Sequence, residues 1–182
     1  GISNLLWTLC LAGLHATGLS LEAGFRILCV SCALAAFIIL WWTSRRVFGK
    51  DRWIARLPLL CVACMSAMPG SYGNGLEGSM AGLSVTLILA GAALPQLGIL
   101  ALGCVTMMLN RPEGVGFVGI VGLWLLYETW RGRQSSRRFL IFAGGMALVF
   151  AALTAFRMGY YGDFVPNTLR AKATGLPDWR QF

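Results

Sequence analysis

The sequence predicts an all-α, polytopic helical bundle in a membrane, and three observations indicate this fold class. Of the 182 residues, 57% are apolar and only 12% are charged, whereas about 25% of a typical soluble domain is charged. Short polar segments divide the apolar sequence into stretches of the kind that form membrane spans. The net charge of +8 comes mainly from two of these segments, a distribution typical of membrane topology rather than of nucleic-acid binding.

The first predicted element is an apolar helix over 5–16, which ends before Thr17 and Gly18. It is shorter than the roughly 20 residues that cross a bilayer. We therefore expect an interfacial or re-entrant helix on the outer side, and we assign residues 1–19 to it. His15 lies near its end and is interpreted as an interface-anchoring residue rather than a ligand or base.

Six spans are predicted over residues 20–156, and their direction follows from charge. The first, over 27–42, leads into a loop with five basic residues and one acid, which places that loop in the cytoplasm. A second cytoplasmic cluster contains Arg131, Arg133, Arg137 and Arg138. The remaining spans alternate in direction and cover residues 57–68, 80–94, 97–109, 115–130 and 139–156. Residues 157–182 are predicted to form an external loop.

Three segments that mix acids with glycine and polar or aromatic residues, 71–77, 110–114 and 160–168, fall on the outer side when the spans are counted. The charge rule fixes only the two basic loops, so this agreement supports the topology. The outward spans 57–68 and 97–109 are short for a bilayer. In one interpretation, these spans extend beyond the stated residues, with flanking side chains reaching the membrane surface. In the other, which we favour, the external loops dip below the membrane surface and line a cavity.

Arg111 is the leading candidate for a binding residue because it follows a long uncharged run. A charge at the bilayer centre costs about 2.5–3.5 kcal/mol, so we expect Arg111 near the outer face with a partner. It pairs with Glu113 or Glu77 to brace two loops, or it binds a phosphate, whose oxygens a guanidinium contacts bidentately. Glu77 follows an Asn-Gly turn and is interpreted as a helix-capping charge, a general base or an acceptor for sugar hydroxyls.

The segment 160–168 combines two adjacent tyrosines with acid, amide and hydroxyl side chains. Tyrosine at a membrane interface is usually part of an aromatic belt. Flat aromatic rings beside hydrogen-bonding groups also suit a sugar or a lipid headgroup. The residues concerned are Tyr160, Tyr161, Asp163 and Asn167, with Lys172 shortly after them.

Two CxxC pairs, Cys29 with Cys32 and Cys61 with Cys64, have a spacing that often marks zinc. Both pairs lie in apolar spans, where thiolates and the polar groups that orient metal ligands are disfavoured. We therefore expect no metal ion, and we interpret these cysteines as small buried apolar side chains, as we do Cys10 and Cys104.

Four motifs occur in order along the chain: Ser3-Asn4-Leu5-Leu6-Trp7-Thr8-Leu9, Gly75-Leu76-Glu77, Arg111-Pro112-Glu113-Gly114, and Tyr160 to Thr168 with Lys172. Each motif alone is weak, but the ordered set is specific and covers nearly the whole chain. The set resembles the GT-C superfamily of membrane glycosyltransferases that use polyprenyl-phosphate sugars, and most closely its branch with the mycobacterial terminal arabinofuranosyltransferases. A loop like the family's Arg-Arg-x-Phe-Gly also occurs, at Arg45 to Gly49.

The resemblance implies that the full-length protein moves a sugar, such as arabinofuranose, from a polyprenyl monophosphate to an acceptor glycan outside a bacterial cytoplasmic membrane. It implies an external juxtamembrane helix before the first span seen here. The family's first transmembrane helix, and the external loop with the acid taken as catalytic base, would precede Gly1. A further C-terminal region would follow Phe182.

On that resemblance, Arg111 stabilises the charge of the leaving phosphate, helped by Arg26 or Lys172, and the upstream acid deprotonates the acceptor hydroxyl. The expected partners are membrane lipid, the donor and the acceptor glycan, with no nucleic acid and no cofactor beyond the donor substrate. Residues expected to bind sugar or acceptor, or to brace the loops, are Asn4, Glu77, Glu113, Tyr160, Tyr161, Asp163 and Asn167.

Two other function classes fit a polytopic membrane chain. A lipid-glycan transporter or flippase would show inverted repeats and polar residues on several spans, but the sequence has no internal repeat and its spans are nearly uncharged. A non-catalytic assembly subunit would lack the acid in the first external loop.

Overall fold

The computed structural model describes residues 4–49, 78–111 and 113–161, and all the regular structure in these ranges is α-helical. This confirms the all-α part of the predicted fold class. The helices are α1 (Leu5–Ala16), α2 (Leu21–Phe48), α4 (Gly78–Ala93), α5 (Leu97–Asn110), α6 (Gly114–Trp130) and α7 (Ser136–Tyr161).

Two of the described helices, α2 and α7, are long and apolar enough to cross a membrane. Only 11% of the most apolar window of each is buried within the protein. A helix that is apolar all round and yet exposed requires an apolar environment from outside the chain, which fits membrane insertion. The helices α1, α4, α5 and α6 are apolar and shorter, and the six-span topology stays a prediction.

A side-chain cap and a glycine conformation define the two ends of α2. Ser20 caps α2, because its Oγ accepts a hydrogen bond from the backbone N–H of Ala23 at 3.3 Å. At the other end, Gly49 has a φ of 58°, a conformation that suits glycine. Arg45 and Arg46, which we predicted in a loop, therefore lie in the last turn of α2.

The end of α7 differs from the prediction. The helix continues through Tyr161, whereas the last span was expected to stop at residue 156. Phe156 and Tyr160, one helical turn apart, stack with ring centroids 5.7 Å apart and planes inclined by 11°, and such pairs support a helix. Tyr160 and Tyr161 therefore belong to the final helical turn and not to the predicted loop.

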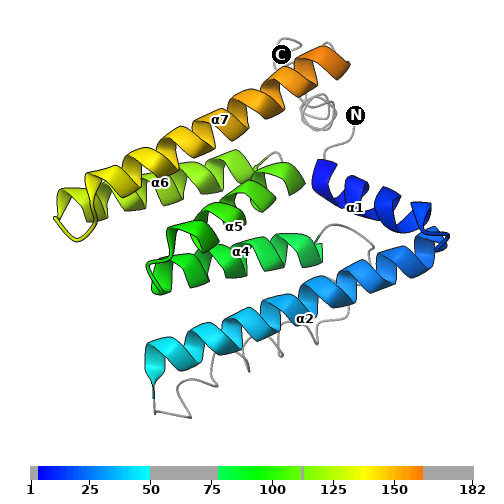
Figure 1. Ribbon diagram of the computed structural model, residues 1–182, viewed down its shortest axis with the longest axis horizontal. Coiled ribbons are helices and arrows are strands. Elements are labelled where there is room, and N and C mark those ends of the chain that lie inside the picture. The colour runs from blue at the N-terminus through cyan, green and yellow to red at the C-terminus, as the bar shows by residue number, and fades with distance from the viewer. Residues whose placement is uncertain (1–3, 50–77, 112, 162–182) are drawn as a thin grey trace, which may run out of the picture.

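From α4 to α7, consecutive helices run back and forth, so their connections alternate between two ends of the bundle (Figure 1). The helices α2 and α4 point the same way, as expected if one span separates them. That predicted span, 57–68, lies outside the described residues. At one end, which we call the basic end, α2 stops, α4 turns into α5, and α6 turns into α7. The basic end contains Arg45, Arg46, Arg131, Arg133, Arg137 and Arg138.

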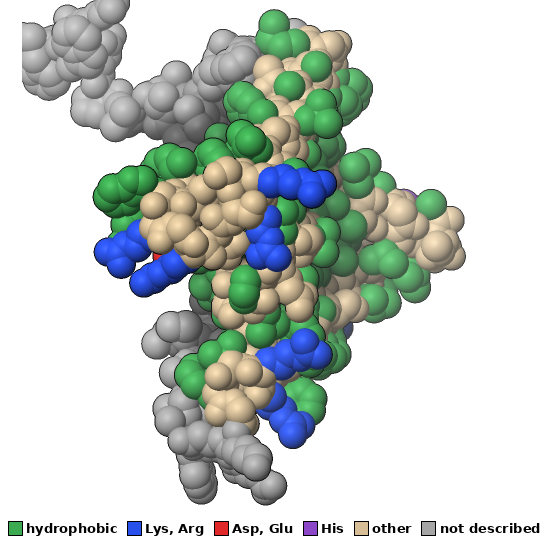
Figure 2. All heavy atoms as spheres, turned by 60° about the vertical axis from the view of Figure 1, so that its left-hand side comes forward, with side chains coloured by type: hydrophobic (Ala, Val, Ile, Leu, Met, Phe, Trp, Pro, Cys, Tyr) green, Lys and Arg blue, Asp and Glu red, His purple; other side chains and the backbone are tan. Residues whose placement is uncertain are grey.

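The described arginines of the two predicted basic clusters thus lie at the same end of the bundle, and their side chains gather on the face seen in Figure 2. Several lie over aromatic rings: Arg45 over Trp41 at 5.2 Å and Arg46 over Trp42 at 4.5 Å from the ring centroid. Arginine beside tryptophan is typical of a membrane interface, where both residue types are enriched.

The α4–α5 hairpin lies at the centre of the bundle and packs unusually closely (Figure 1). A Cβ atom on Gly103 would lie 2.7 Å from the backbone nitrogen of Ile88, and one on Gly91 would meet the backbone of Leu100. Small residues permit this approach of two helices in membrane proteins. The surrounding core is formed by Leu100, Cys104, Met107 and Met108 of α5 with side chains of α4, α6 and α7.

The helix α1 is held by a second apolar cluster against α2 and α4. Trp7 is 6% exposed and meets the ring of Phe25 edge-on at 5.6 Å, and Cys32 and Met80 complete the cluster. Where α1 turns into α2, His15 Nδ1 hydrogen-bonds to the carbonyl of Leu19 at 2.9 Å. His15 therefore closes this turn, and its interpretation as an interface-anchoring residue stays a prediction.

The described cysteines pack as apolar side chains. Cys10 and Cys29 lie around the Trp7 cluster, and Cys104 is completely buried in the central core. No three His, Cys, Asp or Glu side chains converge on a possible metal position within the described ranges. Cys61 and Cys64 lie outside those ranges.

Candidate functional site

The candidate site is the tight turn between α5 and α6, at the end of the bundle opposite the basic end (Figure 1). The helix α5 ends at Asn110, and Arg111 adopts an extended backbone with φ −138° and ψ 137°. The N–H of Arg111 donates to the carbonyl of Met107 at 2.9 Å, and the N–H of Gly114 donates to the carbonyl of Arg111 at 3.0 Å. These bonds fix the backbone that presents Arg111.

Gly114 allows this turn to fold back on α5. A Cβ atom at this position would meet the carbonyl of Met107 and lie 2.8 Å from the backbone nitrogen of Met108. A side chain there would push α6 away from the last turn of α5. The glycine of the Arg-Pro-Glu-Gly motif therefore positions the arginine of the same motif.

Two polar side chains are buried at this turn. Asn110 is 0% exposed, and the Nε atom of Arg111 is buried although the residue as a whole is half-buried. Both residues take part in interactions within the protein. Burying such groups in an apolar bundle is costly unless they are satisfied. The Nε atom of Arg111 is thus shielded from solvent at the end of an apolar helix, and the guanidinium group has further N–H donors.

The first turn of α1 lies beside the last turn of α5 (Figure 1). Asn4, which precedes α1, is half-buried with its Oδ1 atom buried. The structure therefore brings Asn4 to the same end as Asn110 and Arg111, and the juxtamembrane position of α1 stays a prediction. Glu113, also at this turn, is exposed.

Arg26, the predicted helper of Arg111, has a different position. It lies near the start of α2, and its side chain is 75% exposed. Its Nη2 atom forms an ion pair with Glu22 one helical turn away, at 2.6 Å. We therefore leave Arg26 out of the candidate site, and it becomes a useful control residue below.

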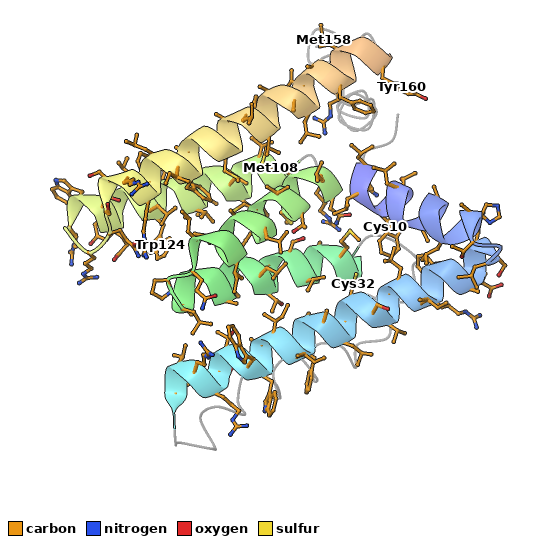
Figure 3. The ribbon with its side chains drawn as sticks, viewed as in Figure 1. Cys10, Cys32, Met108, Trp124, Met158 and Tyr160 are labelled. Atoms are coloured by element: carbon orange, nitrogen blue, oxygen red, sulfur yellow. The ribbon has the colours of Figure 1, made fainter. Side chains whose placement is uncertain are left out.

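Tyr160 is at the end of α7, where it is 71% exposed (Figure 3). Its stacking on Phe156 holds the ring against its own helix. The structure thus places Tyr160 at the same end of the bundle as the α5–α6 turn (Figure 1). Glu77, Asp163, Asn167, Lys172 and the side chain of Tyr161 lie outside the described residues.

Known proteins offer few matches to this chain. No family model and no solved structure matches it. Over 87 residues it is 37% identical to the terminal β-(1→2)-arabinofuranosyltransferase of Mycobacterium tuberculosis. The chain is a distant relative of this enzyme. The matched stretch covers 47% of the chain but only 13% of the enzyme, so the relation supports a glycosyltransferase-like function and nothing finer.

One residue of this site was missed by the sequence reasoning, which treated Asn110 only as the first residue of a polar segment. An asparagine that directly follows a long apolar run and precedes an arginine was the available signal. Its complete burial depends on how α5 packs against its neighbours, which the run itself does not reveal.

Proposed function

We propose that this chain is part of an integral membrane glycosyltransferase that transfers a sugar from a polyprenyl monophosphate to an acceptor glycan. The observation that carries the proposal is Arg111, half-buried with a buried Nε atom, beside the fully buried Asn110 at the end of an apolar helix. The distant relation to an arabinofuranosyltransferase supports the reaction class. It also makes arabinofuranose the first sugar to test.

In the proposed reaction, the bond between the anomeric carbon and the phosphate oxygen breaks, and the phosphate leaves with the electron pair. The acceptor hydroxyl oxygen bonds to the anomeric carbon, and its proton passes to a carboxylate that acts as the general base. Arg111 stabilises the growing negative charge on the phosphate, since a preorganised guanidinium bonds phosphate oxygens more strongly as their charge increases.

We propose that the Arg111 end faces the outside of a bacterial cytoplasmic membrane and that the basic end faces the cytoplasm. The support is the positive-inside rule, applied to two clusters that lie together at one end of the bundle. A polyprenyl phosphate in the outer leaflet would then hold its phosphate at the depth of the α5–α6 turn.

The test is sugar transfer by the full-length protein in detergent with a panel of polyprenyl-phosphate sugars. Losing one donor to a developing oxyanion costs roughly 10²–10³-fold in rate, and we expect a loss of this size for Arg111→Ala. Arg26→Ala removes the same side chain from an exposed position and should stay within about twofold. Full activity of Arg111→Ala would refute the site, and absence of transfer with every donor would favour a transporter or an assembly subunit.

A further inference from the structure

The described aromatic rings differ between the two ends of the bundle. At the basic end, arginines lie over the rings of Trp41, Trp42 and Tyr127, 4.5–5.2 Å from the ring centroids. Arginine beside an aromatic ring is typical of a membrane interface. The end of α7, where Tyr160 lies (Figure 3), has another arrangement, in which one aromatic ring stacks on another.

Phe156 and Tyr160 form an aromatic surface whose outer ring is held in a defined plane. The two rings are inclined by only 11°, with their centroids 5.7 Å apart. Tyr160 is 71% exposed, and Phe156 is 44% exposed. Because the phenylalanine ring supports the tyrosine ring, a ligand that stacks on this surface loses less free energy in ordering the side chain than it would on an unsupported ring.

Trp130 provides a comparison within the same structure. It is as exposed as Tyr160, at 82%, but it lies at the basic end. Its ring is inclined by 47° to that of Tyr127, with the centroids 6.4 Å apart, so the two rings do not stack. The end of α7 therefore differs from the basic end in the orientation of its exposed ring and not merely in exposure.

Polar groups adjoin the stacked rings. Arg157 precedes Tyr160 by three residues, and residues with this spacing are neighbours on a helix surface. The guanidinium of Arg157 carries N–H donors, and the hydroxyl of Tyr160 both donates and accepts. A flat aromatic surface with hydrogen-bonding groups at its edge fits a sugar ring, because the C–H groups of the sugar contact the aromatic face while its hydroxyls bond to the polar groups.

We propose that the stacked rings of Phe156 and Tyr160 bind a sugar ring of the acceptor glycan. The inference rests on the proposed function, which makes a glycan the ligand to consider. The rings lie at the same end of the bundle as the α5–α6 turn (Figure 1), as required if donor and acceptor react on one side of the membrane. An oligosaccharide can contact the rings with one sugar and present another sugar to the donor.

The first test is titration of the full-length protein in detergent, without donor, with an arabinofuranosyl hexasaccharide followed by saturation-transfer NMR. We expect Tyr160→Ala to weaken binding about three- to tenfold, the size of one aromatic contact. Tyr160→Phe keeps the ring, and Trp130→Ala removes an exposed ring from the basic end, so both should stay within about twofold of the unchanged protein. Equal weakening by Tyr160→Ala and Trp130→Ala, or no binding by the unchanged protein, would overturn the proposal.

Kinetics of sugar transfer separate this inference from the proposed function. Tyr160→Ala should raise the KM for the acceptor about three- to tenfold, with kcat and the KM for the donor within about twofold, because it removes binding and not catalysis. A normal acceptor KM in an active Tyr160→Ala variant would refute this inference alone. Glycan binding that depends on Tyr160, without transfer from any donor, would refute the transferase and support the binding surface.

Discussion

At the residue scale, the α5–α6 turn depends on two polar side chains and on the lack of a side chain at a glycine. Arg111 and Asn110 supply the polar chemistry, and Gly114 supplies the space for α6 to start directly against α5. A glycine that touches backbone on the neighbouring helix differs physically from one that faces open space. The sequence contains both kinds in α6, which allows a matched comparison.

Gly114→Ala should lower the free energy of unfolding by about 1–3 kcal/mol, since overpacking against a rigid backbone has this cost. Gly116→Ala is the control, because a Cβ atom there meets nothing within 4 Å. Replacing an exposed helical glycine by alanine gains up to about 1 kcal/mol. Denaturant titration of both variants in detergent measures the difference, and equal stability of the two would contradict the described turn.

At the element scale, α1 is attached to the bundle largely through one aromatic side chain. Trp7→Ala should destabilise the docking of α1 by about 3–5 kcal/mol, the cost of deleting a buried aromatic residue. Trp130 is 82% exposed, so Trp130→Ala should change stability by less than about 0.5 kcal/mol. Hydrogen exchange of the α1 amides reports docking, and unchanged protection in Trp7→Ala would refute this attachment.

The positions of α4, α5 and α6 could be predicted from the sequence because Pro95-Gln96, Arg111 and Arg131 interrupt otherwise apolar runs. The far end of α7 could not, because hydropathy falls at Arg157 while the helix continues for another turn over the Phe156–Tyr160 stack. The juxtaposition of Asn4 with the α5–α6 turn followed from a family pattern. The burial of Asn110 depends on packing between helices, which no run of residues specifies.

At the scale of the whole molecule, the main feature is the separation of the two ends. Arginines beside aromatic rings mark one end, and the α5–α6 turn marks the other. The positions of the arginines predicted the basic end directly, and counting the spans predicted that the α5–α6 turn lies at the opposite end. If the chain crosses the membrane, residues at the two ends should be accessible from opposite sides of it.

Ser135→Cys and Glu113→Cys place thiols in exposed positions at opposite ends, in a chain whose native cysteines are replaced. In sealed right-side-out vesicles, a membrane-impermeant maleimide should label the cysteine at 113 and should not label the one at 135. Inverted vesicles should give the opposite pattern. Labelling of both cysteines from one side would contradict the proposed orientation.

The most direct measurement of the central claim is the affinity of the purified full-length protein for a polyprenyl monophosphate. Hydrogen bonds to charged groups contribute about 1.5–3 kcal/mol, so Arg111→Ala should weaken binding by roughly tenfold or more. Arg26→Ala and Arg138→Ala, which remove arginines from the surface of α2 and from the basic end, should leave it within about twofold. Unchanged affinity in Arg111→Ala, or an equal loss in all three variants, would contradict the assignment of the donor phosphate to the α5–α6 turn.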